Sequence, residues 1–296
     1  MNRKHYALIL SLAVLFCMTS AFAQTVYNFQ TINYPKDTFT QLLGINNSGD
    51  IAGYHNFADN KGFTYNLTSK KFVVENYPKS VSTQVIGINN EPFKTSGFYT
   101  TATGTFGFTD YKGSFTSVSY PGTPFNQLLS QNDYGQAAGY YSTSSTGVPD
   151  TPYLYDEFGG VFEVFYIPGS TSAQATGVNN SSDVVGFFID TDQNMHGWLK
   201  ALGHFAQLDD PDGVGTTAAL GLNNKGQVVG SYMDTSGNTH GFLYTISSNS
   251  YQTIDDPDGI GMTTVNGIND KGDLIGFYGP QACGTNDCQG FVATPQ

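Results

Sequence analysis

From residue 25 onward, short stretches rich in aromatic and β-branched residues alternate with clusters of Asn, Asp, Gly and Pro. Such stretches are typical of β-strands, and the clusters between them are typical of tight turns. No stretch spaces its apolar residues as an α-helix does, and the 35 glycines would destabilise helices further. The pattern therefore predicts an all-β protein made of many short strands.

A motif that begins as GINNSGDIAGY at Gly44 returns five more times. Its copies are spaced by 43, 43, 47, 44 and 46 residues, and they begin at Gly44, Gly87, Ser130, Gly177, Gly221 and Gly267. A proline keeps nearly the same spacing and occurs at Pro35, Pro78, Pro121, Pro168, Pro211 and Pro257. Two markers that keep step over the whole chain indicate six repeats of one structural unit.

Each repeat divides into four predicted strands. The first leads into the Gly-Ile-Asn motif, and the Asn-Asn-Ser-Gly turn that follows predicts a hairpin, since Asn and Gly tolerate positive φ. The other three strands are typified by DIAGY at Asp50–Tyr54, HGFLYT at His240–Thr245 and FVVENY at Phe72–Tyr77. Four antiparallel strands in about 45 residues, repeated six times, are typical of a β-propeller.

The two ends of the chain complement each other. Residues Thr25–Tyr34 resemble the fourth strand of a repeat, whereas Gln289–Thr294 stops after a third strand. A linear β-solenoid does not bring its two ends together, so complementary ends favour a closed ring of repeats. We therefore predict a six-bladed β-propeller of four-stranded antiparallel blades, in which the N-terminal strand completes the last blade and residues 24–296 form a single domain.

A resemblance to a known family rests on this repeat. Gly-x-Asn-x-x-Gly-x-x-x-Gly, followed by His196-Gly197-Trp198 or His240-Gly241-Phe242, resembles the repeat of the bacterial extracellular HAF-repeat proteins, which carry His-Ala-Phe there. The resemblance covers nearly all of residues 24–296. It implies a secreted, β-propeller-like repeat protein, and it implies no particular chemistry.

Charge excludes several classes of partner. The chain carries 24 Asp or Glu against 12 Lys or Arg, a formal net charge of −12. Nucleic-acid binding and adhesion to anionic membranes both depend on Lys and Arg, so we expect neither. The 14% of aromatic residues is ample for a packed core and argues against disorder.

Residues 1–23 have the features of a secretory signal peptide. Arg3 and Lys4 precede the apolar segment Tyr6–Met18, and Ala21-Phe22-Ala23 provides small residues before a cut at Gln24. We therefore expect a soluble, monomeric protein, periplasmic or fully extracellular, with no membrane span. In such a compartment the remaining cysteines, Cys283 and Cys288, are expected to form a disulfide across a loop.

Acidic loops offer a candidate metal site. Oxygen ligands alternate at Asp190, Asp192 and Asn194, as in loops that bind calcium. Met195 occupies the position that a full calcium loop gives to glycine, and Asp and Asn are also ordinary turn residues. Both interpretations stay open, and no other cofactor is implied.

Two further sets of repeated residues could bind a ligand near the channel of a propeller. Aromatic side chains end the second strand of each repeat, and amides occur three residues before the motif glycine in four repeats. Aromatic rings beside amides would suit sugar rings, although both sets could instead pack or hydrogen-bond between blades. The candidate ligand-binding residues are Tyr54, Tyr99, Tyr141, Phe188, Tyr232, Tyr278, Gln41, Gln84, Gln127 and Gln174.

Catalytic motifs are absent from the sequence. It contains no Gly-x-Ser-x-Gly elbow and no His-Glu-x-x-His, and His196 and His240 occupy equivalent places in two repeats. The leading hypothesis is a secreted, non-enzymatic binding or scaffold module that acts through its loop face on extracellular carbohydrate or protein. The alternative is a secreted polysaccharide hydrolase or lyase that uses Asp residues at the channel mouth.

Overall fold

The computed structural model describes residues 24–90, 93–213, 215–280, 283 and 287–296. The predicted signal peptide lies outside these residues. The described chain forms 24 β-strands and contains no helix, which confirms the all-β prediction.

The strands fall into six consecutive groups of four, called units 1 to 6 below. Unit 1 holds β2 (Thr40–Ile45), β3 (Asp50–His55), β4 (Lys61–Asn66) and β5 (Lys71–Val74), and unit 2 holds β6 (Ser82–Ile88), β7 (Thr95–Thr101), β8 (Gly104–Tyr111) and β9 (Ser114–Val118). Unit 3 holds β10 (Phe125–Gln131), β11 (Gln136–Ser142), β12 (Thr151–Asp156) and β13 (Val161–Val164), and unit 4 holds β14 (Ser172–Val178), β15 (Val184–Ile189), β16 (Met195–Ala201) and β17 (His204–Leu208). Unit 5 holds β18 (Ala218–Leu222), β19 (Gln227–Met233), β20 (Thr239–Thr245) and β21 (Ser250–Ile254), and unit 6 holds β22 (Thr263–Ile268), β23 (Leu274–Tyr278), β24 (Gln289–Pro295) and β1 (Tyr27–Thr31).

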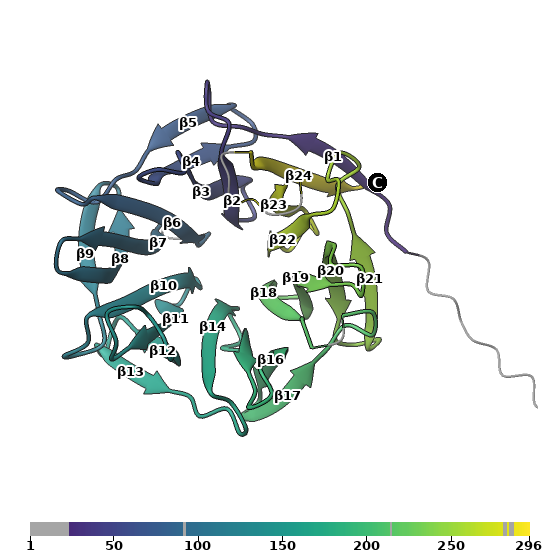
Figure 1. Ribbon diagram of the computed structural model, residues 1–296. Helices are drawn as coiled ribbons and strands as arrows, with labels where there is room; N and C mark the ends of the chain where they lie inside the picture. The colour runs from purple at the N-terminus through teal and green to yellow at the C-terminus, as the bar shows by residue number, and fades with distance from the viewer. Residues whose placement is uncertain (1–23, 91–92, 214, 281–282, 284–286) are drawn as a thin grey trace, which may run out of the picture.

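Hydrogen bonding joins these strands into five sheets. Units 1, 4, 5 and 6 are separate four-stranded sheets, whereas units 2 and 3 form one eight-stranded sheet. A single parallel register between Phe125 of β10 and Thr105 of β8 connects these two units. Figure 1 shows the units arranged around a common centre, with the first strand of each unit innermost.

The N-terminal strand pairs with the last strand of the chain, as predicted. β1 runs antiparallel to β24 from Tyr27 opposite Pro295 to Thr31 opposite Phe291. The backbone N–H of Gln296 donates to the carbonyl of Val26 at 2.9 Å and extends the pairing. The two ends of the chain therefore lie in one sheet.

A β-bulge and a glycine shape each innermost strand. In β2 the register shifts between Leu42 and Gly44, and the same shift recurs in the first strand of every unit. A Cβ atom on Gly44 would lie 2.3 Å from the carbonyl oxygen of Ile86 in unit 2. The motif glycine is therefore required because neighbouring innermost strands approach each other closely.

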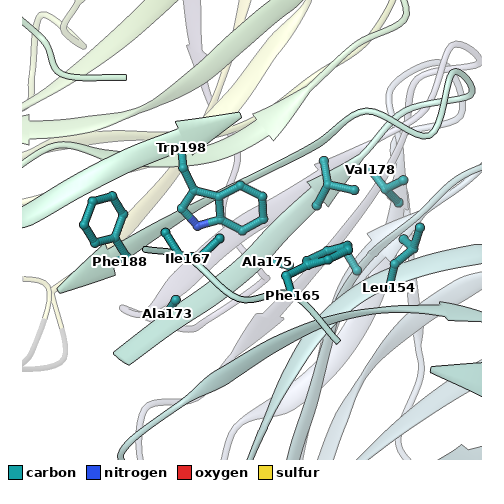
Figure 2. Packing of buried hydrophobic residues seen from close by; sticks show 10 residues of the cluster. Leu154, Phe165, Ile167, Ala173, Ala175, Val178, Phe188 and Trp198 are labelled. Atoms are coloured by element: carbon teal, nitrogen blue, oxygen red, sulfur yellow. The ribbon is translucent and has the colours of Figure 1, made fainter. Parts of the chain in front are cut away.

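The hydrophobic core lies between neighbouring units rather than in one central cluster. Between units 3 and 4, Trp198 is 1% exposed and packs with Leu154, Phe165 and Val178, as Figure 2 shows. The rings of Phe165 and Trp198 meet edge to face with centroids 6.1 Å apart, a favourable arrangement. Similar clusters fill the other junctions, so each unit buries its apolar faces only against its neighbours.

Candidate functional site

The innermost strands and the hairpins that follow them line a central cavity of about 430 Å³. Its lining runs along each first strand, in unit 1 from Gln41 to Asn47. The two ends of this channel differ in chemistry. We call them the asparagine mouth, at the hairpins after the first strands, and the glutamine mouth, at the start of those strands.

A closed circle of side-chain hydrogen bonds surrounds the asparagine mouth. In each unit the first Asn of the hairpin donates its Nδ2–H to the backbone carbonyl of the same Asn in the next unit, over 2.9–3.3 Å. The circle runs from unit 1 to unit 6 and back to unit 1 through Asn46, Asn89, Asn132, Asn179, Asn223 and Asn269. The same amide oxygen also accepts turn N–H groups, as Asn46 Oδ1 does from Ser48 and Asp50, so one residue holds both its turn and its neighbour.

A second circle involves the residue that follows each of these asparagines. Here each backbone N–H donates to the side-chain oxygen of the next unit at 2.7–3.0 Å, through Asn47, Asn90, Asp133, Asn180, Asn224 and Asp270. Asp270 also accepts the amides of Asn47 and Asn224, each at 2.9 Å. Although partial burial opposes the change, these hydrogen bonds lower the pKa of Asp270, so its carboxylate stays charged at neutral pH. Asp133 likewise accepts amides from both neighbouring units, Asn90 and Asn180.

The glutamine mouth is asymmetric. In units 1 to 4 a glutamine faces an aromatic residue across the first two strands, with the pairs Gln41–Tyr54, Gln84–Phe98, Gln127–Tyr140 and Gln174–Phe187. Units 5 and 6 have Ala218 opposite Ser231 and Thr264 opposite Phe277. Units 1 to 4 therefore carry an amide and a ring at this mouth, whereas units 5 and 6 lack the amide and unit 5 lacks the ring as well.

The amides of this mouth are only partly used within the protein. The Tyr54 hydroxyl donates to Gln41 Oε1, the Tyr140 hydroxyl donates to Gln127 Oε1 at 2.7 Å, and Gln174 Nε2 donates to Asp150 at 2.7 Å. Gln84 has no hydrogen-bond partner among the described residues, and neither do Gln127 Nε2 and Gln174 Oε1. These free groups can both donate and accept hydrogen bonds in the cavity.

The middle of the channel contains one further unpaired polar atom. Five units place Leu43, Ile86, Leu129, Thr176 and Leu220 at the bulge position, whereas unit 6 places Asn266 there. The Oδ1 atom of Asn266 is buried and has no hydrogen-bond partner in the described part of the chain. A polar ligand or water in the channel would satisfy it.

The structure places the predicted ligand-binding residues in two groups. Gln41, Gln84, Gln127 and Gln174 all line the cavity, and so does Tyr54. Tyr99, Tyr141, Phe188, Tyr232 and Tyr278 do not line it, and the prediction is corrected there. Alternate residues of a strand face opposite sides of the sheet, so the ring directly across from the glutamine is the first aromatic of each pair. Phe98, Phe187 and Phe277 also end second strands and line the cavity, but the prediction took their neighbours instead; the pairing of each first strand with the second strand identifies the correct member.

The five predicted aromatic residues that do not line the cavity pack against other side chains of the protein. Tyr99 stacks on Tyr77 with centroids 3.6 Å apart, and Tyr141 stacks on Tyr120 at 4.0 Å. Phe188 and Tyr232 lie against histidine rings, and the Tyr278 hydroxyl lies 3.0 Å from Thr31 Oγ1. Four of the five are less than 10% exposed, namely Tyr99, Phe188, Tyr232 and Tyr278. Their repetition therefore reflects packing.

The candidate calcium loop is organised as a capped turn. Asp190 Oδ1 accepts the backbone N–H groups of Asp192 and Asn194, each at 2.8 Å, while its Oδ2 accepts from Asn194 Nδ2 and His196 Nε2, each at 3.2 Å. Asn194 thus turns its amide nitrogen, not its oxygen, toward Asp190. Within the described ranges, no group of three or more His, Cys, Asp or Glu residues is arranged to hold a metal ion. The geometry favours the turn interpretation.

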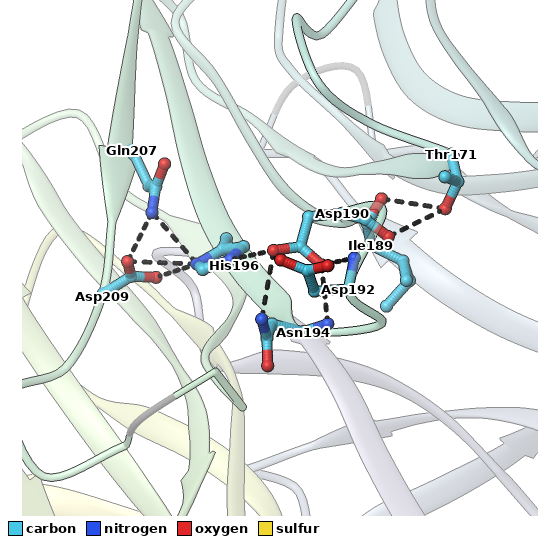
Figure 3. A network of polar contacts seen from close by, with 8 residues as sticks. All are labelled: Thr171, Ile189, Asp190, Asp192, Asn194, His196, Gln207 and Asp209. Carbon is cyan, nitrogen blue, oxygen red and sulfur yellow. Dashed lines mark hydrogen bonds and ion pairs between the residues drawn. The ribbon is translucent and has the colours of Figure 1, made fainter.

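His196 links this turn to the end of strand β17. The ring lies between Asp190 and Asp209, with Nδ1 3.1 Å from the Asp209 carboxylate (Figure 3). Burial alone would lower the pKa of His196, but hydrogen bonds to Asp209 and Asp190 raise it. His240 repeats the arrangement with Asp255 and Asp234 at 2.8 and 3.4 Å. Such repetition indicates a structural role for both histidines.

The predicted disulfide between Cys283 and Cys288 is present. No helix of the described part is long and apolar enough to span a membrane.

Comparisons with known proteins bear on the fold. No protein-family model and no curated protein matches the chain. Among solved structures, it is similar to TolB from Acinetobacter baumannii, with 9% identity, a TM-score of 0.57, and coverage of 73% of this chain and 54% of that one. It thus spans about half the length of TolB. A mutant Aleuria aurantia lectin in complex with Fucα1-6GlcNAc has 11% identity, a TM-score of 0.55, and coverage of 88% and 96%.

A gluconolactonase from Xanthomonas campestris is similar over 91% of this chain and 90% of its own, with 10% identity and a TM-score of 0.54. At such low identity these likenesses concern the fold alone. The chain has a β-propeller-like, all-β fold.

Proposed function

We propose that this chain is an exported, non-enzymatic binding module, built as a closed six-bladed β-propeller, which binds a neutral polar ligand such as a sugar at the glutamine mouth. Export rests on the signal-like residues 1–23. Closure is supported by the strand pair β1–β24 and by the asparagine circle that returns from Asn269 to Asn46. Membership of the HAF-repeat proteins is part of the same proposal and rests on the repeat motif.

One observation carries the binding proposal: free amide groups and aromatic rings meet in one cavity. Gln84, Gln127 and Gln174 offer unpaired donors and acceptors, and Tyr54 and Phe98 line the same channel. Sugars present hydroxyl groups and apolar ring faces together, which match amides and aromatic rings. Asp133 and Asp270 at the other end would repel an anionic ligand.

A glycan array with and without calcium, followed by calorimetry on the best ligand, tests the proposal. The variant Gln84→Ala removes an unpaired amide and should weaken binding about five-fold, which corresponds to about 1 kcal/mol for one hydrogen bond. Gln207→Ala on β17 changes an amide that bonds to Asp209 outside the channel, and should leave affinity unchanged. Binding that is indifferent to Gln84 and Gln127 would refute this location.

The alternative function is a secreted polysaccharide hydrolase or lyase. One observation favours it: Asp150, which contacts Gln174, has a pKa raised to about 6 by burial. Glycoside hydrolysis uses two carboxyl groups, whereas the side chains that form hydrogen bonds with Asp150 among the described residues are those of Ser172 and Gln174, which carry none. Release of reducing ends from a polysaccharide, abolished by Asp150→Asn, would establish the enzyme and overturn the binding module.

A further inference from the structure

A second cavity, of about 280 Å³, lies on the flank of the molecule between units 1 and 2. It is enclosed by β5 of unit 1 and by β7 and the β8–β9 hairpin of unit 2. Its walls include the apolar side chains of Val73, Val74, Phe93 and Phe115. Val73 and Val74 are 60% and 58% exposed, so this apolar surface is open to an incoming molecule.

Two carboxyl groups line the same cleft. Asp110 is only 7% exposed, and its Oδ1 atom is buried with no hydrogen-bond partner among the described residues. Its Oδ2 atom accepts the backbone N–H of Gly113 at 3.2 Å. Glu75 accepts the hydroxyl of Thr95 and lies close enough to Asp110 for the two charges to interact. A buried carboxylate oxygen without a partner is costly, and it calls for a ligand.

The Glu75 carboxyl is an exception among the repeats. The backbone carbonyl oxygen of Glu75 lies so close to Gly62 of the third strand that a Cβ atom there would be only 2.4 Å from it. In four other units the glycine at this place has the same close contact, with the carbonyl of Ile32, Val118, Leu208 or Ile254. In unit 3 the same place is taken by Phe165, whose N–H bonds to Pro152 as that of Glu75 bonds to Gly62. All five equivalents are apolar and at most 5% exposed. Unit 1 therefore has an acid, Glu75, at a position where the other five units have a buried apolar residue.

Among the described residues, the one cationic side chain that lines the cleft, Lys112, is not paired with either acid. Neither Glu75 nor Asp110 forms an ion pair with a described residue. The Nζ atom of Lys112 lies 5.0 Å from the centroid of the Tyr111 ring. Burial, with a contribution from Asp110, raises the pKa of Glu75 to about 7. The cleft is thus prepared to favour a cation.

The walls distinguish an organic cation from a metal ion. Calcium takes six to eight oxygen ligands, whereas Glu75 and Asp110 are the only carboxyl groups among the described residues that line the cleft. Phe93 and Phe115 also line the cleft, and aromatic rings attract ammonium groups and pack on alkyl chains. We propose that this cleft binds a small organic cation, with its primary ammonium group at Glu75 and Asp110 and its alkyl part between the apolar walls.

Calorimetric titration of residues 24–296 with n-butylammonium at pH 8 tests this site, which is separate from the channel. n-Butanol and calcium serve as controls of like shape and like charge, and Nα-acetyl-lysine methylamide shows whether a lysine side chain can also supply the ammonium. We expect n-butylammonium to bind and n-butanol and calcium not to. The proposal would be overturned if calcium bound and n-butylammonium did not, if n-butanol bound as well as n-butylammonium, or if n-butylammonium did not bind.

Four variants locate the binding. Glu75→Gln and Asp110→Asn should each weaken n-butylammonium at least ten-fold, whereas Lys112→Ala should tighten it by removing a competing ammonium group. Glu163→Gln, an exposed glutamate of the equivalent strand in unit 3, should change nothing. Binding should weaken from pH 8 to pH 5 as Glu75 gains a proton; among the described residues, Asp110 and Lys112 are the other titratable groups that line the cleft. Unchanged affinity in Glu75→Gln and Asp110→Asn would refute the site. If those two variants do not fold, unchanged affinity in Lys112→Ala would refute it.

Discussion

Replacing Glu75 with glutamine should stabilise the protein at alkaline pH. In the folded protein burial and the neighbouring Asp110 raise the pKa of Glu75 from 4.5 to about 7. An acid with a raised pKa binds its proton more tightly when folded, so stability is lost as pH rises from 4.5 through 7. Since each factor of ten in proton affinity is about 1.4 kcal/mol, the ionised side chain destabilises the fold by about 3 kcal/mol above pH 7. Glutamine keeps the size and the acceptor for Thr95 but never ionises.

Urea denaturation of the wild type and of Glu75→Gln at pH 5 and pH 8 measures this difference. From ionisation alone, the variant should be more stable by about 1 kcal/mol at pH 5 and by up to about 3 kcal/mol at pH 8. Glu163→Gln is the matched control, because its carboxylate is 58% exposed and pairs with Lys200. Taking the difference between proteins at each pH cancels the titration of groups that do not interact with Glu75, so only Glu75 and its neighbour Asp110 contribute. A pH-independent difference, or a variant less stable at pH 8, would refute the reasoning.

Three further perturbations test the fold. Removing residues 24–34 deletes β1 and leaves β24 as an open edge, so we expect a lower urea midpoint by circular dichroism and aggregates in size-exclusion chromatography; an unchanged midpoint would contradict the role of β1. Gly44→Ala places a Cβ atom 2.3 Å from the Ile86 oxygen and should lower the free energy of unfolding by about 1–3 kcal/mol in urea. Gly159→Ala should have a smaller effect, because Gly159 has no positive φ and the added Cβ would meet the Val161 side chain most closely, at 3.2 Å. Replacing both His196 and His240 with glutamine should lower Tm by about 2 °C at pH 5.5 and by less at pH 9. The pKa of each histidine is raised in the fold, so the protonated rings stabilise the protein at low pH and this stabilisation is lost as pH rises. An equal loss of Tm at both pH values would show that charge is not involved.

Much of the fold is visible in the sequence because each unit repeats its local rules. The turn residues and the markers spaced about 45 residues apart locate the strands, and the strand-like Thr25–Tyr34 predicts the pairing of β1 with β24. The close cysteine pair predicts the disulfide. These features depend on local sequence and chain ends, which a single sequence displays.

The aromatic assignment failed because it depended on strand parity. Adjacent residues such as Phe98 and Tyr99 face opposite sides of one strand, and composition does not reveal which side faces the channel. Only the register, in which Phe98 lies directly opposite Gln84, decides the matter. The register in turn is set by the bulge at Val85 and Gly87, a feature of backbone geometry.

The cleft of Glu75 and Asp110 was also beyond the sequence analysis. The two residues are 35 positions apart and belong to different units, and neither stands in a recognised motif. Aligning the repeats would have shown one signal, since Glu75 takes the place of Ile32, Val118 and the other buried residues. The consequence of that exchange, an acid facing an unpaired carboxylate, requires the packing of two units.

The asparagine circle gives the molecule a sense of rotation. Every amide donates toward the next unit in chain order, so each unit is both a donor to one neighbour and an acceptor from the other, and no unit stands first or last. Separating any two neighbouring units would leave a side-chain donor of one unit and a backbone acceptor of the other without a hydrogen bond. Partial opening is therefore penalised wherever it begins, and we expect the units to unfold together rather than peel from an end, unlike the repeats of a linear array.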